Sequence, residues 1–86
     1  MNRLCIEQVL EKMNNLERTR IKYDDRSEKY YCDGDLERSC KWDHRADLVE
    51  REIVGMEYTL HKLGLGVWKT KDDEWVIPTD DIIRAT

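Results

Sequence analysis

Two cysteines and one histidine lie close together near the middle of the chain, and all three side chain types bind transition metals. Cys40 and His44 are spaced i, i+4, and seven residues, including Gly34, separate Cys32 from Cys40. Two thiolates and an imidazole suit Zn²⁺, which structural sites hold with four such ligands at about 2.0 to 2.3 Å. The cluster therefore predicts a structural zinc site.

The fourth ligand of this predicted site is not fixed by the local cluster. Cys5 is our first choice, because three cysteines and one histidine form a common closed zinc set. Asp33, Asp35, Asp43 and His61 remain alternatives. Two other interpretations stay open: buried reduced cysteines beside an exposed histidine, and a disulfide or redox pair.

Two helices must position these residues. Asn2 is a candidate N-cap, and apolar residues at three- and four-residue steps predict a first helix that runs to about Ile21. We expect the sulfur of Cys5 to face the interior from this helix. The charged segment 23–39, with a turn at Gly34, is predicted to be a connector.

A second helix over residues 39–63 shows the clearest apolar pattern. Its apolar residues alternate in steps of four and three, as a heptad seam does, and Gly64 is placed to end the helix. The seam consists of Trp42, Ala46, Val49, Ile53, Met56, Leu60 and Leu63. We expect it to pack on the first helix, with a homodimer seam as the alternative.

The C-terminal part is predicted to form a short hairpin. β-Branched and aromatic runs within residues 67–77 flank a polar turn, and Trp68 and Trp75 are expected to pair across it. Pro78 should end the hairpin, and residues 79–83 are expected to form a last helical turn. The predicted fold class is α+β and mainly helical: two principal helices with a short C-terminal β-hairpin, stapled by zinc if the cluster binds it.

Size and composition limit the other possibilities. The 86 residues allow a single small domain, 1–86, with a thin core because 40% of the residues are charged and no Phe is present. A net charge of −4 makes nucleic acid a poor default partner and anionic membranes equally so. No apolar stretch approaches the roughly 18 residues of a membrane span.

Basic residues do group locally, but acidic residues interleave with them along the sequence. The groups are Arg18, Arg20, Lys22 and Arg26, then Arg38, Lys41 and Arg45. Such mixed runs are typical of solvated helix faces. A calcium loop starting at Asp33 is disfavoured, because the sixth and twelfth positions are Arg38 and His44. With no phosphate-binding loop or nucleophile elbow, we do not expect an enzyme.

The segment Leu48 to Gly64, LVEREIVGMEYTLHKLG, followed by Leu65-Gly66-Val67-Trp68, resembles the helix-then-hairpin ending of small accessory proteins encoded by bacteriophages and prophages. The general build also resembles that of anti-CRISPR inhibitors. This resemblance covers about half of the chain and carries no diagnostic motif. It implies a non-enzymatic protein in the cytoplasm of the host bacterial cell that binds an effector nuclease and obstructs guide or target loading.

Two other functions remain open from the sequence. One is a zinc-stabilised regulator that binds nucleic acid through Arg38, Lys41 and Arg45 on the second helix. The other is a small structural homodimer built on the heptad seam.

Overall fold

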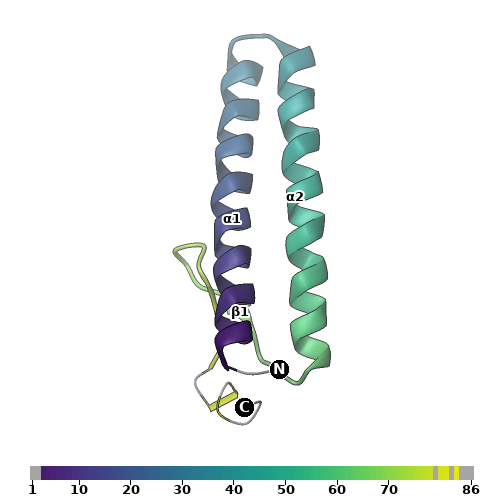
Figure 1. Ribbon diagram of the computed structural model, residues 1–86. Coiled ribbons are helices and arrows are strands. Elements are labelled where there is room, and N and C mark those ends of the chain that lie inside the picture. The colour runs from purple at the N-terminus through teal and green to yellow at the C-terminus, as the bar shows by residue number, and fades with distance from the viewer. Residues whose placement is uncertain (1–2, 79, 82, 84–86) are drawn as a thin grey trace.

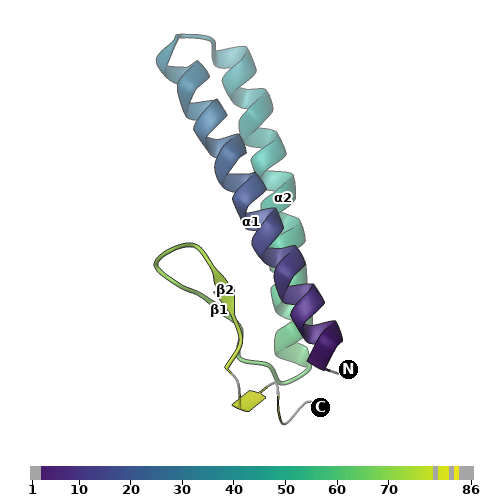
Figure 2. The ribbon, with the colours of Figure 1, turned by 60° about the vertical axis from the view of Figure 1, so that its left-hand side comes forward.

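The computed structural model describes residues 3–78, 80–81 and 83 and shows a mainly helical α+β fold (Figures 1 and 2). Helix α1 spans Arg3–Cys32 and helix α2 spans Leu36–Lys62; the antiparallel strands β1, Trp68–Lys69, and β2, Trp75–Val76, form a hairpin. The two helices run side by side as an antiparallel pair, and the hairpin lies beside only one half of it. The molecule is a rod of 51 × 20 × 16 Å.

Facing residues fix the register of α1 against α2. The hydroxyls of Ser27 and Ser39 each donate to the other residue's carbonyl oxygen at 2.9 Å. One turn nearer the hairpin, the rings of Tyr23 and Trp42 lie 5.3 Å apart. Continued down the pair in heptad steps, this register places Ile6 opposite Leu60. The heptad seam of α2 therefore packs on α1, as its period predicts, except at its last residue: Leu63 follows the helix and is 51% exposed.

The apolar core is confined to the half of the helix pair that the hairpin covers. Its buried members come from both helices, the segment after α2, the second strand and the residue after that strand: Ile6, Met13, Ile53, Leu60, Leu65, Val67, Trp75 and Ile77. We call this half the proximal half. Residues 20–47, beyond the hairpin, form the distal half, where Ser39 and Ala46 occupy the buried seam positions of α2. Small and polar side chains replace an aliphatic core there.

A side chain of α1 holds the second strand as another strand would. Asn14 Oδ1 accepts from the backbone N–H of Trp75 at 2.6 Å, and Asn14 Nδ2 donates to the carbonyl oxygen of Trp75 at 3.2 Å. These two bonds satisfy backbone groups that an edge strand leaves open. The hairpin turn reverses at Asp73, which has φ 59°, a conformation that Asp tolerates.

The structure corrects the predicted end of the first helix. That helix does not stop near Ile21 but continues to Cys32, so most of the predicted connector is helical. Its inner stripe continues through Tyr23, Ser27 and Tyr30, which fill seam positions without being aliphatic and so escaped the apolar count. The turn at Gly34 is confirmed, with φ 80°.

Two further predictions about side chains are wrong. Cys5 is exposed, because it lies one residue before the buried Ile6 and points away from the seam. Trp68 does not pair with Trp75: the register sets Trp68 opposite Val76, so Trp75 is buried and Trp68 is half exposed. In the predicted last helical turn, Asp80, Asp81 and Ile83 are helical, and residues 79 and 82 lie outside the described part.

Candidate functional site

The residues of the predicted zinc site are not all brought together. Cys5 and Cys32 lie in the first and last turns of α1, and the 27 intervening steps at 1.5 Å per residue separate them by about 40 Å. Cys40 and His44 lie one turn apart on the outer surface of α2, near the turn that joins the helices. All four side chains are exposed.

Cys5 therefore does not reach the other three residues within one chain. Within the described residues, no three His, Cys, Asp or Glu side chains are arranged to hold a metal ion. Zinc binding by Cys32, Cys40 and His44 stays a prediction. The interpretation of the cysteines as buried is wrong, because each is exposed.

The distal half instead gathers aromatic rings and arginines on one face. The guanidinium carbons of Arg26, from α1, and Arg45, from α2, lie 4.6 and 4.5 Å from the ring centre of Trp42. Tyr23 packs on the same indole at 5.3 Å. Further toward the turn, Arg38 lies over Tyr30 at 5.7 Å. Cation–π contacts of this kind supply attraction that an aliphatic core would otherwise provide.

We call this surface the basic face. Its cations occupy two heptad positions on each helix, on the side of the seam where Tyr23 and Trp42 lie. Within residues 22–32 of α1 and 36–45 of α2, no acidic residue occupies these positions. The members are Lys22, Arg26, Lys29, Arg38, Lys41 and Arg45. Two of these cations have ion pairs: Arg38 Nε lies 3.5 Å from Oδ2 of the half-buried Asp35, and Lys41 Nζ lies 4.0 Å from Oε1 of the exposed Glu37. Within the described part of the chain, the other four cations have no ion pair.

The opposite surface of the distal half is acidic. The charges of Glu17, Asp24 and Glu50 all act on Arg20 and raise its pKa, with the hydrogen bond to Glu17 as the largest cause. This arrangement places carboxylates of α1 and α2 on the side that carries the hairpin. We call the surface the acidic face. It consists of Asp24, Asp25, Glu28, Asp43 and Asp47, and Glu50 continues it past the distal half to the border with the hairpin.

A buried carboxylate joins the hairpin to the helices at the border of the two halves. Glu17 is 1% exposed; it accepts from Arg20 Nε and from Lys69 Nζ, both at 2.8 Å. Burial by itself raises the pKa of Glu17, but the hydrogen bonds and charges of Arg20 and Lys69 outweigh it, so the pKa is lowered. Glu17 is therefore held as a carboxylate and works as a structural anchor.

A cavity of about 180 Å³ lies beside this anchor. Glu17, Arg20, Lys69 and Trp75 are among the residues that line it. The Nε1 of Trp75 is buried and has no hydrogen-bond partner in the described residues.

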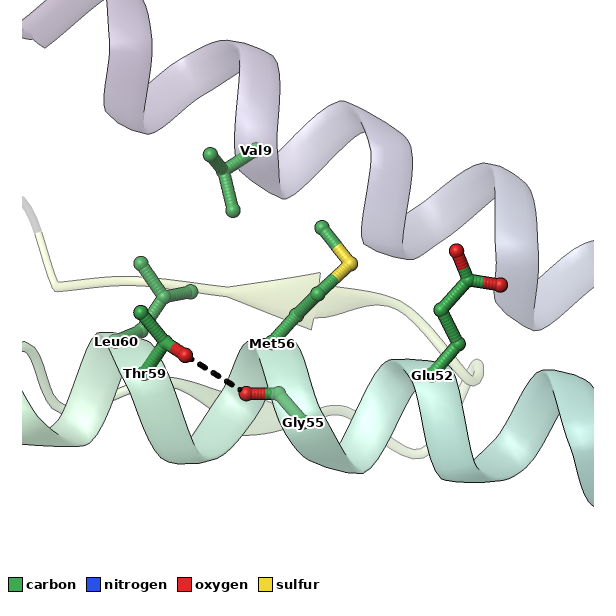
Figure 3. Close-up of a pocket in the computed structure, with 6 residues that line it drawn as sticks. All are labelled: Val9, Glu52, Gly55, Met56, Thr59 and Leu60. Atoms are coloured by element: carbon green, nitrogen blue, oxygen red, sulfur yellow. Dashed lines mark hydrogen bonds between the residues drawn. The ribbon is translucent and has the colours of Figure 1, made fainter.

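An apolar groove lies on the other side of the helix pair, in the proximal half (Figure 3). Val9 of α1 and Met56 of α2 extend toward each other across it. Gly55 adds no side chain to the groove, and a Cβ there would meet nothing within 4 Å. The hydroxyl of Thr59 donates to the Gly55 carbonyl oxygen at 2.9 Å. The groove has a volume of about 300 Å³ and a single acidic lining residue, Glu52.

Sequence reasoning named most of the basic residues but missed their separation from the acidic ones. Residues two apart on a helix point to different sides, so Asp24 and Arg26 are neighbours in sequence and lie on opposite faces. A helical projection that extended the first helix past Ile21 would have found both faces. Glu17 and Asn14 gave no signal, because the hairpin residues that they bind are more than fifty residues away.

Comparison with known proteins finds no matching family model, no similar curated protein and no similar solved structure. Within the described residues, no helix is long and apolar enough to cross a membrane.

Proposed function

We propose that this chain is a phage-derived, non-enzymatic interaction protein that binds and inhibits a host CRISPR effector nuclease. The observation that carries the proposal is the acidic face of the distal half. Its carboxylates project from two long helices, and the hairpin leaves that half uncovered. RNA-guided nucleases hold their guide–target duplex in a positively charged channel, which is a surface complementary to this face.

The geometry of the acidic face suits such a channel. Carboxylates three or four residues apart on one helix are about 5 to 6 Å apart at their Cβ atoms. Asp43, Asp47 and Glu50 have this spacing on α2, and Asp24 and Glu28 have it on α1. Because both rows sit on rigid helices, little conformational entropy is lost when they dock.

Zinc at Cys32, Cys40 and His44 is part of this proposal. These residues belong to the ends of the helices that flank the turn at residues 33–35. A metal ion there would connect the end of α1 to the start of α2, where the contacts between the helices are polar. It would act as a structural group.

The test is a pull-down of purified chain against a panel of RNA-guided effector nucleases, with a DNA-cleavage assay for each. We expect one nuclease to be bound and its cleavage suppressed. The variant Asp43→Lys/Asp47→Lys should lose both effects. The control Asp72→Lys/Asp80→Lys makes the same change in net charge in the exposed hairpin turn and C-terminal segment.

The outcomes separate the explanations. Absence of both binding and protection across the panel would contradict the proposal. Equal loss in the two variants would show that net charge, and not the acidic face, governs the effect.

A further inference from the structure

We propose that the basic face of the distal half binds single-stranded nucleic acid. This inference goes beyond the proposed function and does not depend on it, since it concerns the opposite surface of the helix pair. It begins from the six cations that the fold collects from two helices. Three come from residues 22–29 of α1 and three from residues 38–45 of α2.

The cations form two rows with aromatic rings between them. Each row spans seven steps of 1.5 Å, or about 10 Å, and packed helices lie about 8 to 10 Å apart. Tyr23, Tyr30 and Trp42 lie along the line between the rows, where the two helices meet. A positively charged track with rings along it is the pattern by which proteins hold single strands without base pairing.

Arg26 and Arg45 are preorganised to bind phosphate groups. Their contacts with Trp42, at 4.6 and 4.5 Å, hold both guanidinium groups in place before any ligand arrives. A guanidinium has five N–H donors in a rigid fork, so a contact with a ring leaves donors for a bidentate phosphate contact. Neither arginine is neutralised by a carboxylate in the described part of the chain, so binding costs no existing ion pair.

The net charge of −4 does not prevent this binding. The rod is 20 Å by 16 Å across, whereas charges are screened beyond about 8 Å at physiological ionic strength. A strand on the basic face therefore experiences mainly the near cations, while the acidic face acts on the far side. The expectation that acidity disfavours nucleic acid holds for the average field and not for this surface.

A single strand fits better than the other polyanions. The two rows are separated by one helix-to-helix distance, which admits one backbone between them. Unpaired bases can stack on rings or on arginine planes, whereas an acidic protein offers charge without stacking. Duplex DNA would present two backbones and no exposed base faces to the rings.

The experiment is fluorescence anisotropy of labelled 20-nucleotide oligo-dT and oligo-rU with the full chain. If the four cations without ion pairs each neutralise one phosphate, affinity should fall about 50-fold between about 50 and about 200 mM salt, from a slope of roughly −0.7 per contact. Duplex of equal length and polyglutamate serve as competing ligands.

Matched variants locate the binding surface. Lys22→Glu/Lys29→Glu reverses two exposed charges of the basic face without touching Trp42 and should weaken binding more than tenfold. Arg18→Glu/Arg51→Glu makes the same charge change on the outer surface and should weaken binding less than threefold. Arg26→Lys/Arg45→Lys keeps the charge but loses the bidentate geometry, and it should weaken binding while leaving the salt slope unchanged. Circular dichroism checks that each variant is folded.

Several results would overturn the inference. These are no binding at low salt, equal losses in the Lys22/Lys29 and Arg18/Arg51 variants, or a preference for duplex. If polyglutamate competes as strongly as the oligonucleotides, the basic face recognises negative charge alone. That result would also refute the inference.

Discussion

Replacing the buried carboxylate of Glu17 by the isosteric amide should destabilise the fold strongly. The Glu17→Gln side chain keeps one acceptor oxygen but turns an NH₂ group toward either Arg20 or Lys69. At least one hydrogen bond to a cation is lost, at about 1.5 to 3 kcal/mol each, and the other is weakened. We expect a loss of about 3 kcal/mol, at the low end for a broken buried pair because Lys69 is 36% exposed.

That loss is large for a chain of this size. Stability of about 0.05 to 0.15 kcal/mol per residue gives about 4 to 13 kcal/mol for 86 residues. A loss of about 3 kcal/mol should therefore lower the Tm by about 12 to 24 °C. Urea unfolding followed by circular dichroism at pH 7 gives the free energy directly.

A double-mutant cycle with Lys69→Met isolates the tie between hairpin and helices. We expect a coupling energy between Glu17 and Lys69 of about 1 to 2 kcal/mol. Lys71→Met is the matched control, since it removes the same charge from the exposed turn and should change stability by less than about 0.5 kcal/mol. Additive effects of Glu17→Gln and Lys69→Met, within about 0.3 kcal/mol, would refute the assignment of Glu17 as an anchor.

Acid should remove the same contribution. The pKa of Glu17 is lowered in the folded state from its unfolded value of 4.5, so folding favours the carboxylate. Its contribution is fully present above that unfolded value and is lost as pH falls through the lower folded pKa. The difference in stability between wild type and Glu17→Gln should therefore shrink in acid. A difference that stays constant between pH 7 and pH 3 would contradict this linkage.

Three further perturbations test the fold and the metal prediction. Asn14→Ala leaves two backbone groups of the second strand without partners and should cost about 2 to 3 kcal/mol in urea unfolding, whereas a loss below 0.5 kcal/mol would contradict the clamp. Gly55→Ala should raise the free energy of unfolding by about 0.5 to 1 kcal/mol, because a Cβ at this helical position meets nothing within 4 Å. Gly64→Ala should lower the free energy of unfolding, because Gly64 has φ 82°, which alanine rarely adopts. Equal effects of the two substitutions would contradict this reasoning. If zinc binds as predicted, metal analysis should find one ion per chain. Cys40→Ser and His44→Ala should each lower the melting temperature of the zinc-loaded protein. A purified chain without metal, together with variants that melt at the wild-type temperature, would contradict the zinc prediction.

The sequence was sufficient to predict the elements whose residues repeat locally. The heptad steps from Trp42 to Leu60 predict α2 and the face that packs on α1, and the runs around the polar turn predict the hairpin. Period and turn chemistry are local properties, so they can be read without the fold. The end of α1 was missed because its inner stripe changes from aliphatic residues to Tyr23 and Ser27, which a hydrophobic count ignores.

Long-range partners were outside the reach of the sequence. Nothing local distinguishes Glu17 from the other glutamates of α1, and only the hairpin, which returns Lys69 and Trp75 to it, makes it a buried anchor. The predicted metal set failed to assemble at Cys5 for a related reason. Its position in a long helix, and not its chemistry, decides how far it lies from Cys32.

The division of the rod into two halves connects stability with recognition. The proximal half contains the aliphatic core, the Asn14 clamp and the Glu17 anchor, so most of the folding free energy originates there. The distal half is held by small polar contacts and by rings packed with arginines, and most of its exposed residues are charged. Charged residues there that do not pack on the rings can change at little cost to folding, since surface substitutions away from such contacts usually alter stability by less than about 0.5 kcal/mol. The distal half is therefore where this chain can accept changes in surface charge while it keeps its fold.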